Sequence, residues 1–174
     1  MAKLQLNQVR KNLRVNMTEC TITPHIMSRS TKFDFDVFLP SISKNLQREL
    51  CWSLLQKQQL ILSILKGIRL PHMAFLQLLD DTYQVIDGKQ RLNTIIEFYS
   101  NKFSIEANGQ QYFFSDFDDD CHHVFMTCPL RYFFVYDNTD KMFDDQFKID
   151  WLEQINFAGT PMDLEHLRSL RGEK

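Results

Sequence analysis

Alternating apolar and polar residues predict strands in the first half of the chain. Residues 33–39 alternate large apolar side chains with acidic ones, which is the pattern of a half-buried strand that ends at Pro40. Residues 72–79 and 83–86 form two apolar runs on either side of a polar turn. This arrangement is typical of a β-hairpin.

Apolar residues at three- and four-residue spacing predict two helices in the same region. Ser53 stands three residues before Gln56, as in a capping box, and the helical pattern that follows continues to Lys66. Gly67 is placed to end this helix. A second helical pattern runs over residues 92–99, directly behind the predicted hairpin.

The second half of the chain mixes both kinds of element. Residues 103–114 predict a hairpin closed by Asn108-Gly109, residues 131–136 a strand and residues 147–155 a helix. Thr160 is placed to cap a last helix. The order of the elements indicates an α+β fold with a small mixed sheet and packed helices, because it is too irregular for a doubly wound sheet.

A strand–turn–helix junction lies at Asp87-Gly88-Lys89-Gln90-Arg91. Asp87 and Gln90 have capping-box spacing, so we expect the tight turn to open the helix. Such a turn directs free N–H groups and the positive end of the helix dipole at one place, where an anion such as phosphate binds. Lys89 and Arg91 would add cationic donors there.

Length and charge favour one folded domain preceded by a basic N-terminal segment. The chain has 174 residues with only 5 Gly and 5 Pro, and its net charge of −2 lacks the basic excess of many nucleic-acid-binding proteins. Residues 1–32 hold six Lys and Arg against Glu19 alone and read as a loose basic arm. We therefore expect an arm over residues 1–32 and a single domain over residues 33–174.

Neither membrane insertion nor disulfide bonding is expected. No apolar run approaches the roughly 18 residues of a membrane span, and no CxxC pair is present, which favours a cytoplasmic protein with reduced thiols and no membrane partner. Cys121, His122, His123 and Cys128 contain zinc-ligand residue types, but their spacing fits no standard zinc finger, so a structural role is favoured.

Three segments carry a resemblance to a known family. They are Leu46-Gln47-Arg48 with the helix and Pro71 that follow, the run Tyr83 to Leu92, and the late run Glu153 to Asp163. In this order they resemble the N-terminal domain of GmrSD-type restriction endonucleases, of the ParB/sulfiredoxin-like superfamily. The signature loop of that domain reads Asp-Gly-Gln-Gln-Arg, and its late element reads Asn-x-x-Gly-Thr-Pro.

The resemblance implies a compact ParB/sulfiredoxin-like fold that binds and hydrolyses a nucleoside triphosphate with Mg²⁺. It also implies restriction of foreign, often modified, DNA, with DNA binding or nicking. Carried over residue by residue, Asp87 and Arg91 become catalytic and Asp87 also a metal ligand. The nucleotide-binding residues would be Gln47, Arg48, Gly88, Lys89, Gln90, Asn156 and Thr160.

Two departures from the family pattern keep alternatives open. Lys89 replaces the first Gln of the signature, and the chain has no room for a C-terminal His-containing nuclease domain. The alternative function is a non-catalytic nucleotide- or DNA-binding adaptor or regulator, which works with a separate nuclease chain or interferes with one; a homodimer is also open. Asp87 could simply cap the helix, Arg91 could form a buried ion pair, and Asn156 and Thr160 could cap helix ends.

Overall fold

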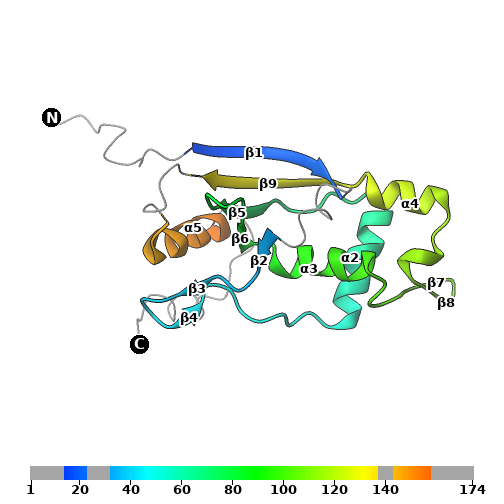
Figure 1. Ribbon diagram of the computed structural model, residues 1–174. Helices are drawn as coiled ribbons and strands as arrows, with labels where there is room; N and C mark the ends of the chain where they lie inside the picture. Colours follow the sequence, from blue (N-terminus) through cyan, green and yellow to red (C-terminus); the bar gives the residue numbers. More distant parts are fainter. Residues whose placement is uncertain (1–13, 23–31, 137–142, 158–174) are drawn as a thin grey trace.

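The computed structural model describes residues 14–22, 32–136 and 143–157. Within them, helices pack on both faces of a five-stranded mixed sheet, and two small hairpins complete the fold (Figure 1). The strands are β1 (Arg14–Thr21), β2 (Phe33–Asp34), β3 (Phe38–Leu39), β4 (Lys44–Asn45), β5 (Met73–Gln77), β6 (Tyr83–Asp87), β7 (Ile105–Ala107), β8 (Gln110–Tyr112) and β9 (Pro129–Tyr136). The helices are α2 (Leu54–Leu65), α3 (Lys89–Tyr99), α4 (Asp119–Met126), α5 (Asp145–Phe157) and the short 3₁₀ helix η3 (Phe114–Asp116).

The strand order in the main sheet is β1-β9-β5-β6-β2. β1 runs antiparallel to β9 and β5 antiparallel to β6, whereas β5 pairs with β9 and β2 with β6 in parallel. The expected α+β fold with a small mixed sheet is confirmed. None of the described helices is long and apolar enough to cross a membrane.

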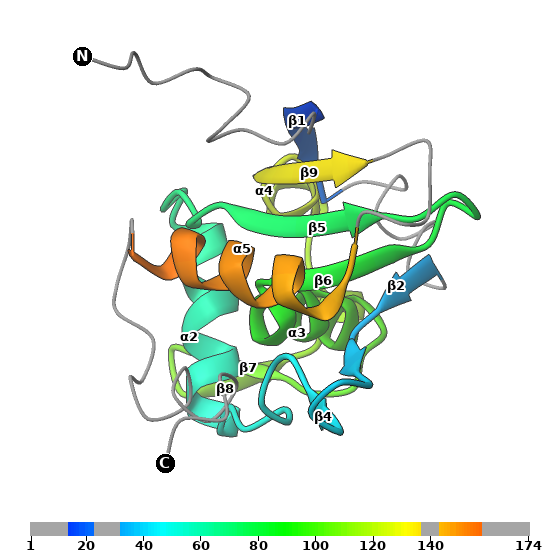
Figure 2. The ribbon, with the colours of Figure 1, turned by 90° about the vertical axis from the view of Figure 1, so that its left-hand side faces the viewer.

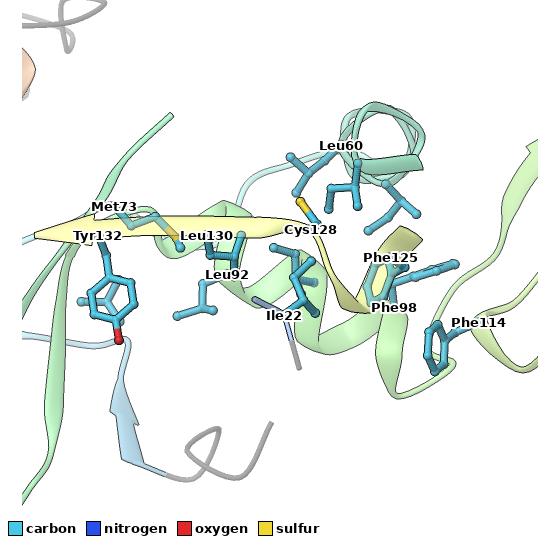
Figure 3. Packing of buried hydrophobic residues seen from close by; sticks show 14 of the residues in the cluster. Ile22, Leu60, Met73, Leu92, Phe98, Phe114, Phe125, Cys128, Leu130 and Tyr132 are labelled. Atoms are coloured by element: carbon cyan, nitrogen blue, oxygen red, sulfur yellow. The ribbon is translucent and has the colours of Figure 1, made fainter. Parts of the chain in front are cut away.

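One face of the sheet carries α2, α3 and α4. Their apolar stripes meet the sheet in a core rich in aromatic rings, in which Phe98 and Phe125 have ring centroids 5.6 Å apart (Figure 3). Ile61, Leu92 and Phe75 bring α2, α3 and β5 into the same core. Burial of these large side chains is the main stabilising contribution on this face.

The opposite face carries α5 and the chain around the β3–β4 hairpin. Ile149 and Leu152 of α5 pack on Leu76 and Val135 of the sheet, together with Leu39. Figure 2 shows α5 lying across β5 and β6, with α2 and α3 behind the sheet. The molecule therefore has two cores separated by one sheet.

Local signals in the sequence place several elements well. The capping box of α2 is confirmed, since Ser53 Oγ accepts the N–H of Gln56 and the Gln56 side chain accepts the N–H of Ser53. Asn108 and Gly109 both adopt positive φ in the β7–β8 turn, as the hairpin prediction requires. The predicted cap at Thr160 lies outside the described residues.

Three expectations differ from the structure. Residues 14–21, expected in a loose arm, form β1 and pair with β9 along their whole length. Residues 33–39 are not one strand: Asp34 Oδ1 accepts the N–H of Asp36, the chain turns, and its apolar residues pass from the first core to the second. Residues 119–126, for which the sequence pattern predicts no helix or strand, form α4, which is capped by Asp118 and anchored by buried Phe125.

Candidate functional site

A left-handed glycine makes the turn between β6 and α3. Gly88 has a φ of +96° and occupies the N-cap position of α3, where the N–H of Leu92 donates to its carbonyl. A Cβ at Gly88 would lie 2.5 Å from Cγ of Met73, so no other residue fits without displacing Met73. The turn does open the helix, as expected, but the predicted capping box of Asp87 and Gln90 is wrong because no side chain caps α3.

The uncapped start of α3 leaves backbone donors available. Lys89, Gln90 and Arg91 are the first three residues of the helix, and their N–H groups have no acceptor within the helix. The positive end of the helix dipole lies at the same place. An anion at this junction would receive its hydrogen bonds from these backbone amides.

Asp87 and Arg91 form an ion pair beside this helix start. Arg91 Nη2 donates to Asp87 Oδ2 at 2.8 Å and to the carbonyl of His72 at 3.2 Å, and Nη1 donates to the carbonyl of Pro71 at 2.5 Å. The Arg91 side chain is 15% exposed and the Asp87 side chain is 27% exposed, so solvent still reaches the pair. Arg91 thus fixes the Asp87 carboxylate and ties the end of β6 to the segment that enters β5.

Lys89 belongs to a different contact. Its side chain is only 2% exposed, and Nζ lies 2.8 Å from Oδ1 of Asp36, whose own side chain is 70% exposed. Asp36 lies between β2 and β3, so the ion pair ties this crossing segment to the start of α3. Asp36 is a partner that no pattern in the sequence indicates.

Gln47 and Gln90 hold the segment before α2 against the junction. Gln90 Oε1 accepts the N–H groups of Cys51 and Trp52 at 3.1 and 3.3 Å, and Nε2 donates to the carbonyl of Glu49 at 2.9 Å. Gln47 Nε2 donates to the carbonyls of Val85 and Ile86 at the end of β6. Two of the predicted nucleotide-binding residues therefore make structural contacts at the junction.

Of the remaining predicted residues, the structure describes the side chain of Arg48 but not those of Asn156 and Thr160. Arg48 is exposed and follows Gln47 in the segment that is tied to the junction. Asn156 contributes only backbone to α5, because its side chain and Thr160 lie outside the described residues. Sequence reasoning missed the carbonyls of Pro71 and His72 as Arg91 acceptors, since a backbone carbonyl leaves no residue-type signal.

No group of three or more His, Cys, Asp and Glu side chains could hold a metal ion within the described part of the chain. Cys121, His122, His123 and Cys128 form no such group among the residues that the structure describes. His122 packs its ring on Phe114, with centroids 4.4 Å apart. Burial raises the pKa of the Cys128 thiol to about 11, which disfavours the thiolate that binds metals.

The chemistry of Asp87 fits a magnesium ion held jointly with a ligand. Mg²⁺ is commonly bound through one or two carboxylates together with substrate phosphates and water. Only Oδ2 of Asp87 bonds to Arg91, and Oδ1 has no hydrogen-bond partner among the residues described. One carboxylate oxygen is thus available next to the uncapped helix start.

Comparison with known proteins gives one match. The family model described as GmrSD restriction endonuclease, N-terminal domain, matches residues 31–157. The matched range contains the whole junction from Gln47 to Arg91 and ends with α5. Comparisons with curated proteins and with solved structures give no match.

Proposed function

The chain belongs to the family of GmrSD restriction endonuclease N-terminal domains, and from this membership we propose that it binds a nucleoside triphosphate at the β6–α3 junction and hydrolyses it. The family gives the chain a role in restriction. The observation that carries the proposal is the uncapped start of α3 next to the Asp87–Arg91 ion pair. Backbone donors, a carboxylate and a guanidinium are the groups that phosphoryl transfer uses.

In this proposal the phosphates accept hydrogen bonds from the N–H groups of Lys89, Gln90 and Arg91. Gln47 and Gln90 set the distance between the segment before α2 and the junction, and Arg48 contributes positive charge at its rim. Gly88 supplies the left-handed conformation that lets α3 begin directly after β6, so that these N–H groups gather at one place. Asn156 and Thr160 remain proposed contacts to the ribose or phosphates.

Hydrolysis would depend on Asp87. Its second oxygen, Oδ1, would accept a proton from an attacking water or hold Mg²⁺, while Arg91 keeps the carboxylate in one orientation. Mg²⁺, when bound there, would neutralise phosphate charge. The N–H groups of Arg91 that do not contact Asp87, Pro71 or His72 would stabilise the charge that develops on the phosphate.

A second candidate function is nucleotide or DNA binding without turnover. The observation that favours it is that the side chains of Lys89 and Gln90 both make contacts within the protein, to Asp36 and to the carbonyl of Glu49. In that case the chain would be an adaptor or regulator, with DNA and a separate nuclease chain as its partners. A homodimer fits either candidate.

The test combines calorimetric titration of ATP, GTP, CTP and UTP in Mg²⁺ with measurement of phosphate release. We expect the wild-type protein to bind and hydrolyse at least one of them. Asp87→Asn should bind that nucleotide within a few-fold of wild type and lose about 100-fold or more in hydrolysis, because a carboxylate acting as base is removed. Arg91→Ala should lose both.

Glu97→Gln is the matched control for Asp87→Asn. Glu97 also lies on α3 and also forms an ion pair, with Lys57 at 2.6 Å, but at a distance from the junction along the helix. It should leave binding and hydrolysis unchanged. Binding without phosphate release in the wild type would move the conclusion to the second candidate, and hydrolysis that survives Asp87→Asn would contradict the role of Asp87.

A further inference from the structure

Two rings stack on the sheet beside the junction without belonging to either core. His72 lies over Phe133 with ring centroids 5.1 Å apart and an angle of 29° between the planes. His72 is exposed and Phe133 is partly buried. Phe133 is absent from both sets of packed apolar side chains, so its ring contributes to neither core within the described residues.

Strand register puts this stack at the level of the candidate site. Met17 of β1 pairs with Phe133 of β9, Phe133 with Ala74 of β5, and Ala74 with Asp87 of β6. Phe133 is thus two strand spacings, about 10 Å, from Asp87 along this row. Arg91 connects the two places directly, because it donates both to Asp87 and to the carbonyl of His72.

The stack lies on the face that α5 covers only in part. Val135, two residues from Phe133 on β9, is buried against α5 in the second core, so both side chains point to that face. In Figure 2, α5 crosses β5 and β6 while β9 and β1 extend beyond it. Met17, paired with Phe133 on this uncovered part, is 65% exposed.

We infer that the His72–Phe133 stack, flanked by Met17, binds the nucleobase of the nucleotide whose phosphates lie at the start of α3. An exposed ring stacked on a partly buried one, close to anion-binding groups, matches a ligand that has a planar ring at one end and negative charge at the other. Base stacking on aromatic side chains tolerates every base, so we expect all four nucleotides to use this surface. The inference rests on the proposed nucleotide site and adds the base subsite to it.

The test compares ligands with and without a base on the full chain. Calorimetry would measure binding of ATP, CTP, adenosine and inorganic tripolyphosphate, each with Mg²⁺, to wild type and His72→Ala. His72→Ala keeps the backbone carbonyl that Arg91 uses. We expect it to weaken ATP and CTP about 5- to 150-fold, the usual effect of removing one stacking partner, and to leave tripolyphosphate unchanged.

Two further variants separate stacking from structural damage. His72→Phe restores a ring and should recover most of the affinity, whereas Phe38→Ala removes a ring from β3 that is also exposed and should change nothing. All variants should melt within a few degrees of wild type, since both altered side chains are exposed.

Each remaining outcome decides between the two sites. If wild type binds tripolyphosphate as tightly as ATP, or if His72→Ala binds ATP normally, the base subsite is wrong and the phosphate site stands. If adenosine binds and tripolyphosphate does not, the stack is supported and the phosphate site fails. If no probe binds, both proposals are wrong.

Discussion

At the scale of single residues, position 88 requires glycine for two reasons: its positive φ and the close approach of the Met73 side chain. Gly88 and Gly67 both have positive φ, +96° and +71°, but an added Cβ meets Met73 at 2.5 Å in the first case and nothing within 4 Å in the second. We expect Gly67→Ala to lower the free energy of unfolding by about 1 kcal/mol through backbone strain. Gly88→Ala should cost about 3 kcal/mol, since overpacking adds to that strain. Urea denaturation of both variants measures the difference.

A double variant isolates the contact itself. Met73→Ala opens space beside Gly88, so the two changes together should cost less than the sum of their separate effects. Equal costs for Gly88→Ala and Gly67→Ala, or strict additivity with Met73→Ala, would show that Met73 does not limit the residue at position 88.

At the scale of elements, two helices with different caps predict different responses to acid. Hydrogen bonds from the backbone and then the side chain of Cys121 hold the pKa of Asp118 below its ordinary value of 3.8. A depressed folded pKa gives stabilisation that is fully present above the ordinary value and is lost progressively as the pH falls from that value through the lower folded pKa. Asp118→Ala should therefore destabilise clearly at pH 7 and less at pH 3.

Ser53 provides the uncharged comparison. Its hydroxyl caps α2 and does not titrate, so Ser53→Ala should cost about 1 kcal/mol at both pH values. Chemical denaturation of the wild type and the two variants at pH 7 and pH 3 gives the required differences. A cost of Asp118→Ala that stays constant between the two pH values would contradict the assignment of a charged cap to α4.

The elements found from sequence are those with local signals. The Ser53 capping box, the left-handed Gly67 and the Asn108-Gly109 turn each act within a few residues, so the pattern alone locates them. The alternation over residues 33–39 predicts one strand, because the pattern is the same whether a chain stays on one face of a sheet or crosses from one face to the other. α4 has one buried residue, Phe125, which is too little to produce a visible helical period.

The same division applies to the candidate site. Asp87, Gly88 and Arg91 are neighbours in sequence, and their junction follows from the order strand, turn and helix. Asp36, Pro71 and His72 reach the site only through the fold, from distant segments. Sequence alone therefore gives the centre of the site and not the contacts that orient it.

At the scale of the whole molecule, the folded unit includes residues that read as a loose arm. β1 forms one edge of the main sheet, and its register with β9 runs unbroken from Arg14 opposite Tyr136 to Thr21 opposite Pro129. Ile22 follows β1 with 0% exposure, and its N–H donates to the carbonyl of Cys128 at 3.2 Å. The strand is not recognisable from the sequence pattern, because an edge strand that is half open to solvent needs few apolar residues.

Substitutions in this segment test whether it unfolds together with the rest of the sheet. Ile22→Ala should lower the free energy of unfolding by about 2–5 kcal/mol, because it leaves a cavity in the first core. Met17→Ala, at a position 65% exposed in the preceding strand, should change it by less than about 0.5 kcal/mol. Because Ile22 belongs to the cooperative unit, the urea transition of Ile22→Ala should move to lower concentration with an unchanged slope. If residues 14–22 were a loose arm, the urea midpoints of Ile22→Ala and Met17→Ala would both equal that of the wild-type protein, because neither side chain would be buried in the folded state.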